Sequence, residues 1–361
     1  MELWEVLKIS SNIGQKLDAS DHRMPLQSAI AKLVAGQDLS GDEMSTAMAL
    51  IMSGQASAAQ IGGFLVALRM KGETVAEITA AARVMRDLSE PVEASTDHLV
   101  DTCGTGGDGA GTFNISTTSA LVVAAAGGRV AKHGNRSVSS RSGSADVLEA
   151  AGVNIALTPA QVSACIAEIG IGFMFAPAHH QAMRHAVAPR RELGIRTLFN
   201  LLGPLTNPAG ASAQLIGVFQ ARWTEPLAQV SRNLGSTHVM VVHGEDGLDE
   251  ISISAPTRVT ELREGAIANY RLTPEQFGIG SADLGAIKAG DTLESLARMR
   301  SVLDNDPGPA LDIVLLNAGA ALYVCGVARE ISAGVALARE TLAQGSARQK
   351  LEQLVKVTNA F

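Results

Sequence analysis

Apolar residues recur at helical spacing throughout residues 24–95, and this segment contains no strand-like alternation. Segments 40–43 and 74–77 read SGDE and TVAE, a hydroxyl followed three residues later by Glu, which is the capping box that begins a helix. Two apolar faces are formed by Ile61, Phe64, Leu65 and Leu68 and by Ile78, Ala81, Ala82 and Met85. The pattern predicts a small all-helical domain, whose apolar faces either pack on each other or bind a second copy of the chain.

After residue 95, short apolar runs alternate with helical patterns. Strand-like runs cover residues 98–101, 129–132, 172–176, 215–219 and 238–243. Helical patterns cover residues 117–126, 143–151, 177–191 and 225–234, and closing helices are expected over 335–357. Alternation of this kind is typical of a mostly parallel sheet flanked by helices. We therefore predict an α/β fold, with the helical domain followed by a large α/β domain over residues 96–361.

Three segments are harder to interpret. Residues 251–300 mix short strand-like runs with charged turns and give the weakest pattern of the chain. Residues 310–328 are apolar but contain Asp312 and Asn317, which favours a buried strand and helix over a membrane span. Residues 1–23 are mixed polar, lack the apolar core of a secretory signal, and are interpreted as a leader of uncertain origin outside the fold.

Composition narrows the class of protein further. Aromatic residues make up only 3% of the 361 residues, so the core must be built from Ala, Val, Leu, Ile and Met. The net charge of −7 disfavours a nucleic-acid binder with a broad basic face. The 3 cysteines lie far apart without paired spacing, which favours reduced thiols in a cytoplasmic protein over disulfides or a zinc site.

Residues 101–144 hold the densest collection of glycines, small hydroxyls and cations. Residues 104–109 read GTGGDG directly after a predicted strand, and 114–117 read NIST where the next helix is expected. Glycine lets backbone N–H groups approach an anion, and a helix N-terminus attracts it further. A dinucleotide fingerprint is disfavoured, because the helix begins late and the next strand ends in Lys132 rather than in an acidic residue. The segment therefore predicts a phosphate site.

Three other groups of polar residues follow predicted strands or their connections, and each has two interpretations. The run of cations and hydroxyls at 132–140 fits either the rim of that phosphate site or a charged surface. Asp249 and Glu250 fit either Mg²⁺ bound with a phosphate or a solvated acidic turn. In the basic segment 179–191, an arginine could bind a substrate carboxylate, or the segment is a solvated face, and the pattern does not separate Arg190 from Arg191.

Residues 101–108, 114–117, 132–140 and 192–208 together resemble the anthranilate phosphoribosyltransferase family, and so does the turn at 243–250. The resemblance covers about residues 25–357, and it implies that residues near 180–210 pack with the helical domain. It also implies a homodimer through that domain, two Mg²⁺ ions per subunit, and the small-molecule substrates phosphoribosyl pyrophosphate and anthranilate. Neither nucleic acid nor a membrane is expected as a partner.

The resemblance also implies roles for individual residues. The phosphoribosyl donor would contact Gly104, Gly107, Asp108, Thr112, Asn114, Ile115, Ser116, Thr117, Lys132, His133, Gly134, Asn135, Arg136, Ser137, Val138, Ser139, Ser140 and Ser144. Anthranilate would contact Gly104, His133, Asn135, His179 and Arg190, and Mg²⁺ would be held by Ser116, Asp249 and Glu250. No single catalytic acid or base is expected, because Lys132 and Mg²⁺ would stabilise the departing pyrophosphate.

Two alternatives belong to the same fold family. A pyrimidine nucleoside phosphorylase would use phosphate as the nucleophile, but the runs at 132–136 and 198–208 favour the anthranilate enzyme. A non-enzymatic relative that binds nucleic acid would need a basic surface, which the net charge does not provide. That alternative also leaves the pair Asp249 and Glu250 without a role.

Overall fold

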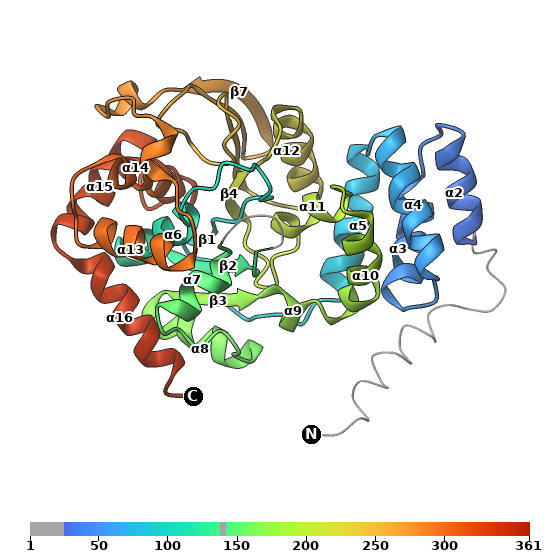
Figure 1. The fold of residues 1–361 in the computed structure, drawn as a ribbon, viewed down its shortest axis with the longest axis horizontal. Coiled ribbons are helices and arrows are strands. Elements are labelled where there is room, and N and C mark those ends of the chain that lie inside the picture. The colour runs from blue at the N-terminus through green and yellow to red at the C-terminus, as the bar shows by residue number, and fades with distance from the viewer. Residues whose placement is uncertain (1–24, 138–141) are drawn as a thin grey trace.

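The computed structural model describes residues 25–137 and 142–361. In Figure 1 a cluster of helices from the N-terminal part of the chain stands beside a larger body that contains the sheet. The predicted leader at 1–23 lies outside the described residues, as do Val138, Ser139 and Ser140. Within the described ranges no helix is long and apolar enough to cross a membrane.

The N-terminal cluster consists of α2 (Leu26–Val34), α3 (Gly41–Met52), α4 (Ala58–Lys71) and α5 (Val75–Asp87). Its helices begin where the capping boxes predict them, because the Ser40 hydroxyl accepts from the Glu43 N–H and the Thr74 hydroxyl accepts from the Glu77 N–H. Two later helices, α10 (Arg184–Leu193) and α11 (Phe199–Leu202), pack against α3, α4 and α5. The exact division of the chain into domains stays a prediction.

The sheet has seven strands in the order β3-β2-β1-β4-β5-β6-β7. Their bounds are β1 (Leu99–Asp101), β2 (Arg129–Gly134), β3 (Ile171–Phe175), β4 (Ala213–Gly217), β5 (His238–Gly244), β6 (Thr257–Arg263) and β7 (Ala266–Leu272). The first five are parallel and confirm the predicted α/β class, whereas β6 and β7 add an antiparallel edge. Glu264 and Gly265, both at positive φ, form the tight turn between β6 and β7.

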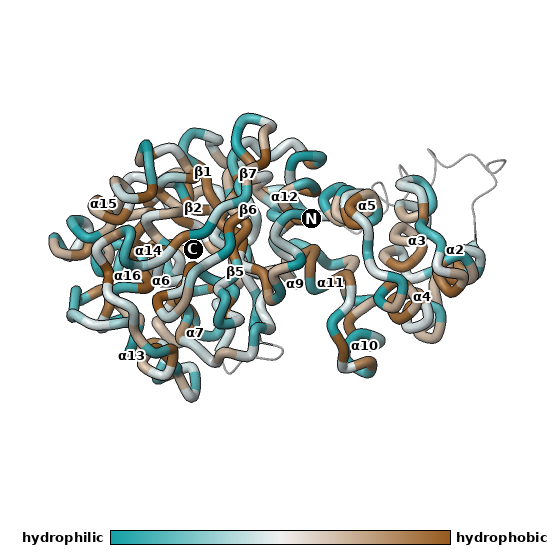
Figure 2. Tube along the Cα trace, turned by 90° about the horizontal axis from the view of Figure 1, so that it is seen from above, coloured by the Kyte–Doolittle hydropathy of each residue, from teal (hydrophilic) through white to brown (hydrophobic). Residues whose placement is uncertain are grey.

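Helices cover the sheet, as the alternation predicts. They are α6 (Ile115–Ala125), α7 (Ser144–Ala150), α8 (Pro159–Ile169), α9 (Ala176–His179), α12 (Thr224–Asn233), α13 (Thr292–Leu303), α14 (Pro309–Val324), α15 (Ile331–Ala343) and α16 (Ser346–Thr358). Short 3₁₀ turns are η1 (Gln181–Met183), η2 (Gly203–Leu205), η3 (Ala221–Trp223), η4 (Pro274–Phe277) and η5 (Leu284–Ile287). In Figure 2 this larger body and the N-terminal helices lie at opposite ends, with α9 and α11 between them.

Two predicted elements were wrong. The predicted strand and helix at 310–328 are the single helix α14, which is buried on nearly every side between α6, α15 and the sheet and therefore shows no one-sided apolar pattern. Its polar Asn317 is satisfied there by donating to the carbonyls of Ile251 and Ile313. The predicted helix at 177–191 is broken, because His180 leaves the helical conformation and its side chain is buried.

Candidate active site

The glycine loop follows β1 and folds back onto the acidic turn. Positive φ angles occur at Gly106, Gly107, Gly109 and Gly111. Only glycine adopts such angles without strain, which explains the composition of the loop. The Gly106 N–H donates to Asp249 Oδ2 at 2.9 Å, and the Thr105 N–H donates to the carbonyl of Gly217 at 2.8 Å. The structure therefore joins two motifs that are far apart in the sequence.

The acidic turn follows β5 and holds two half-buried carboxyl groups, those of Asp249 and Glu250. Burial raises the pKa of Glu250 to about 7, although the charge of Lys132 and hydrogen bonds from Ser116 oppose the rise. Burial also raises the pKa of Asp249, and the neighbouring charges of Asp108 and Glu250 raise it further. These five side chains come from the glycine loop, the start of α6, β2 and the acidic turn, so the structure brings predicted metal and donor residues from four parts of the chain together.

Lys132 lies beneath the glycine loop with 3% of its surface exposed. Its ammonium donates to the carbonyl of Thr102 at 2.6 Å. Burial raises the pKa of Asp101 to about 6, while the nearby charge of Lys132 and a hydrogen bond from Asn207 lower it. The carboxyl groups of Asp101, Asp108, Asp249 and Glu250 thus outnumber the positive charge that Lys132 supplies, and the region would be stabilised by a further cation.

The oxygen ligands at the acidic turn fit Mg²⁺ only if substrate phosphates supply further ligands. Within residues 25–137 and 142–361, no group of three or more His, Cys, Asp or Glu side chains is placed to hold a metal ion by itself. Mg²⁺ usually binds through one or two carboxylates together with substrate phosphates. The half-buried carboxyl groups of Asp249 and Glu250, with Ser116 beside Glu250, match that kind of site.

The N-terminus of α6 faces the same region. Asn114 precedes the helix but makes no capping bond to it, because its Oδ1 accepts from Ser295 Oγ at 2.7 Å and from Ser142 Oγ at 3.1 Å. The hydroxyl of Thr117 is buried without a partner in the described part of the chain. Uncapped N–H groups at a helix N-terminus attract an anion. Thr112, further back in the loop, pairs with Lys288.

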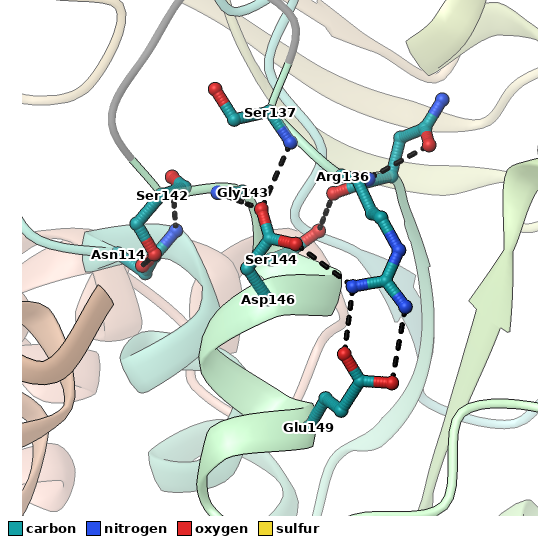
Figure 3. A network of polar contacts seen from close by, with 9 residues as sticks. Asn114, Arg136, Ser137, Ser142, Gly143, Ser144, Asp146 and Glu149 are labelled. Carbon is teal, nitrogen blue, oxygen red and sulfur yellow. Dashed lines mark hydrogen bonds and ion pairs between the residues drawn. The ribbon is translucent and has the colours of Figure 1, made fainter. Parts of the chain in front are cut away.

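Arg136 is engaged within the protein. Its guanidinium pairs with Asp146 at 3.0 Å and with Glu149 at 2.7 Å, as Figure 3 shows. Asn135 is exposed, and its backbone carbonyl accepts from Ser144 Oγ at 3.3 Å. The role of Arg136 as a donor contact stays a prediction, but its charge is already balanced by two carboxylates.

A cluster of three buried histidines is formed by His133 near the end of β2 and by His179 and His180 at the end of α9. The ring centroids of His133 and His180 are 5.2 Å apart, and His179 Nδ1 lies 3.2 Å from the carbonyl of Glu90. Burial lowers the pKa of His133 to about 3 and that of His180 to about 4, so both rings are neutral at physiological pH. His133 Nδ1 lies 3.1 Å from the Gly203 carbonyl and must donate to it, which leaves Nε2 unprotonated.

Arg190 projects from α10 over the ring of Phe199, 5.0 Å from its centroid. Among the described residues it forms no ion pair with a carboxylate, and burial lowers the pKa of its guanidinium. A half-buried cation without a counter-charge favours an anionic ligand. Arg191, by contrast, is exposed, so the structure separates two residues that the sequence pattern does not.

Arg196 has no role in the sequence predictions. It lies inside the run 192–208 that carries the family resemblance, yet nothing local connects it to the glycine loop. In the structure its guanidinium donates to the carbonyl of Gly107 and stacks 4.4 Å from the ring centroid of Phe219. His180 was likewise missed, although it adjoins His179.

Two family models match the chain. The glycosyl transferase family helical bundle domain matches residues 27–89, and the glycosyl transferase family a/b domain matches residues 96–348. The fold and the buried site at the ends of the parallel strands agree with these models. The protein is therefore a glycosyl transferase with a helical bundle and an α/β domain.

Individual relatives show which family of glycosyl transferases the chain belongs to. The anthranilate phosphoribosyltransferase of Thioalkalivibrio sulfidiphilus is 65% identical over 93% of this chain and 99% of its own length. The crystal structure of the Thermus thermophilus enzyme is 46% identical with a TM-score of 0.87 over 92% of this chain and 99% of that one. The Saccharomyces cerevisiae enzyme in complex with PRPP and Mg is 26% identical, with a TM-score of 0.86 over 94% of this chain and 100% of that one. This chain belongs to the anthranilate phosphoribosyltransferase family.

Proposed function

We propose that phosphoribosyl pyrophosphate binds between the Gly104 loop, the start of α6 and the acidic turn, and that anthranilate binds beside Arg190. The protein would transfer the phosphoribosyl group to the amine of anthranilate, giving N-(5-phosphoribosyl)anthranilate and pyrophosphate. This reaction is the second step from chorismate in L-tryptophan biosynthesis. The observation that supports the arrangement best is the contact of Gly106 N–H with Asp249, which joins a glycine loop to a half-buried carboxylate pair.

The donor half of the site must bind a polyanion and stabilise its leaving group. We assign two Mg²⁺ ions to Ser116, Asp249 and Glu250 together with the donor phosphates, in keeping with the Mg in the yeast relative. Bound Mg²⁺ would neutralise charge that develops on pyrophosphate. The N–H groups of the glycine loop and of α6 would bind phosphate oxygens, and Lys132 would hold Asp101 and Glu250 in place from beneath.

The acceptor half must place an aromatic amine with a carboxylate. Arg190 would pair with the carboxylate, since its guanidinium has no ion-pair partner among the described residues. His133 would support this half of the site from behind, since its Nδ1 donates to the Gly203 carbonyl and its unprotonated Nε2 is buried without a partner among the described residues. The amine nitrogen then bonds to the anomeric carbon as the bond to pyrophosphate breaks, and the proton that the amine loses passes to the departing pyrophosphate or to water. An arylamine is unprotonated at neutral pH, so positioning contributes more than a strong base.

The reaction is tested by mixing the protein with phosphoribosyl pyrophosphate, Mg²⁺ and anthranilate and following the fluorescence of anthranilate. We expect the fluorescence to decay only when all components are present. Release of a base from a pyrimidine nucleoside and phosphate would instead support the nucleoside phosphorylase. Binding of an oligonucleotide without any decay would support the nucleic-acid-binding relative.

We also propose a homodimer through the helical domain, in the cytoplasm. Val34 and Met70 lie near the C-terminal ends of α2 and α4, which pack together, and they are 74% and 82% exposed. Large apolar side chains exposed on neighbouring helices are typical of an interface. Sedimentation of the protein in solution measures the mass of the assembly. A mass equal to that of one chain would contradict the proposal.

A further inference from the structure

One carboxylate oxygen binds two backbone positions that are not neighbours in the sequence, Ser137 and Gly143. Asp146, in the first turn of α7, uses Oδ2 to accept from the Ser137 N–H at 3.0 Å and from the Gly143 N–H at 2.9 Å. Figure 3 shows both bonds converging on this side chain. Backbone N–H groups bound to a carboxylate make short, strong hydrogen bonds. The two backbone positions are therefore tied to each other through Asp146.

The other oxygen of Asp146 is tied to an arginine. Oδ1 accepts from Arg136 at 3.0 Å, and the guanidinium of Arg136 also forms a two-bond pair with Glu149 at 2.7 and 3.0 Å. Because Arg136 lies directly before Ser137 and Glu149 lies one turn after Asp146, the pair holds α7 against the end of β2. Arg136 thus supports Asp146 instead of pointing its charge at a phosphate.

The backbone at this point leaves no room for displacement. A Cβ atom on Gly143 would lie 2.4 Å from the Ser137 nitrogen and 2.6 Å from the Asn135 carbonyl oxygen. A Cβ atom on Gly134 would lie 2.2 Å from Ser144 Oγ. Such contacts place the backbone of 134–137 directly against that of 143–144.

The same contacts extend to α6 and α13. Ser142, next to Gly143, donates through Oγ to Asn114 Oδ1 and accepts through its carbonyl from Asn114 Nδ2 at 3.2 Å. Asn114 in turn accepts from Ser295 of α13. A shift of Gly143 would therefore reach Ser144 on one side and Asn114 on the other, two residues that the family resemblance implies as donor contacts.

We infer that Asp146 is a positioning residue that fixes Ser137, Ser144 and Asn114 for the pyrophosphate of the donor. The inference rests on the proposed function and adds a residue that does not itself contact the substrate. It assigns Arg136 to the support of Asp146. It also predicts a larger effect on the donor than on the acceptor. The side chain of Asp146 itself binds Ser137, Gly143 and Arg136, whereas the implied acceptor contact Asn135 is reached only through the backbone and Arg190 is not reached.

The experiment compares Asp146→Ala, Asp146→Asn and Glu149→Gln with the unchanged protein. Steady-state kinetics give the KM for each substrate, and calorimetry gives the Kd for phosphoribosyl pyrophosphate with Mg²⁺. We expect Asp146→Ala to raise the KM and the Kd for the donor by about 10- to 100-fold, as loss of charged hydrogen bonds does, with a clearly smaller rise in the KM for anthranilate. Asp146→Asn keeps an oxygen for both N–H groups and should restore most of the donor affinity. Glu149→Gln keeps a hydrogen-bond partner for Arg136 and leaves Asp146 in place, so it should raise the donor KM much less than Asp146→Ala does.

Thermal unfolding of each variant separates positioning from general damage. A donor KM and Kd of Asp146→Ala within twofold of the unchanged values would overturn the inference, and so would equal rises in both KM values. If the unchanged protein binds the donor but transfers nothing to anthranilate, the proposed acceptor fails while the donor Kd still tests Asp146. If the unchanged protein does not bind the donor, the inference falls together with the proposed function.

Discussion

Gly217 offers the sharpest test of how the acidic turn is held. It ends β4, its carbonyl accepts from the Thr105 N–H at 2.8 Å, and its Cα faces the backbone of Asp249. A Cβ atom at this position would lie 1.5 Å from the Asp249 carbonyl oxygen. The substitution Gly217→Ala therefore forces β4 and the acidic turn apart while leaving every proposed ligand in the sequence.

The size of the shift follows from that distance. Real Cβ contacts essentially never fall below 3.0 Å, so the backbone at Gly217 and the backbone at Asp249 must separate by at least 3.0 − 1.5 = 1.5 Å. The Asp249 carboxylate, now 2.9 Å from the Gly106 N–H, moves with its backbone or loses that bond. Because a displacement of about 1 Å can cost about 100-fold in rate, we expect kcat to fall by about 100-fold or more.

The assay is the anthranilate fluorescence decay at a series of Mg²⁺ concentrations. Gly217→Ala should lower kcat and raise the Mg²⁺ concentration needed for half-maximal rate, because Asp249 is a proposed Mg²⁺ ligand. Gly280→Ala is the matched control, since Gly280 lies in an exposed loop with no atom within 4 Å of its added Cβ and no positive φ. Urea unfolding shows whether the altered protein is still folded under assay conditions. A folded Gly217→Ala protein with unchanged kcat and Mg²⁺ dependence would refute the reasoning.

Two other predictions concern the acceptor side of the site. Arg190→Ala should raise the KM for anthranilate by about 10- to 100-fold and leave the donor KM within about twofold, with the exposed Arg191→Ala as control; equal effects on both substrates would contradict carboxylate binding. His180 has a pKa of about 4 in the folded protein and about 6.5 when unfolded, so the unfolded state binds more protons between these values. The free energy of unfolding should therefore fall as the pH drops below about 6.5, by up to about 1.4 kcal/mol per pH unit for this residue. Urea unfolding of His180→Gln should show a shallower fall, and an identical slope would count against the buried neutral ring.

Local signals in the sequence were enough for most of the elements. Ser40 and Thr74 cap their helices because a capping box satisfies N–H groups only three residues away. The five parallel strands follow from apolar runs a few residues long, whose burial on both faces requires helices on either side. The predictions failed where the environment overrides the pattern, as in α14, which is buried nearly all round, and at His180, which interrupts a helical pattern to bury its ring.

By itself the sequence determined which residue types are present for the reaction: a glycine loop, an acidic pair and a basic segment. It did not determine which of these residues contact one another. The hydrogen bond between Gly106 and Asp249 joins residues 143 positions apart. Arg136, which the sequence suggests as a phosphate contact, instead pairs with Asp146 and Glu149. Only the tertiary structure decided these partners, because hydrogen bonds between distant residues depend on how strands and helices pack and leave no periodic trace along the chain.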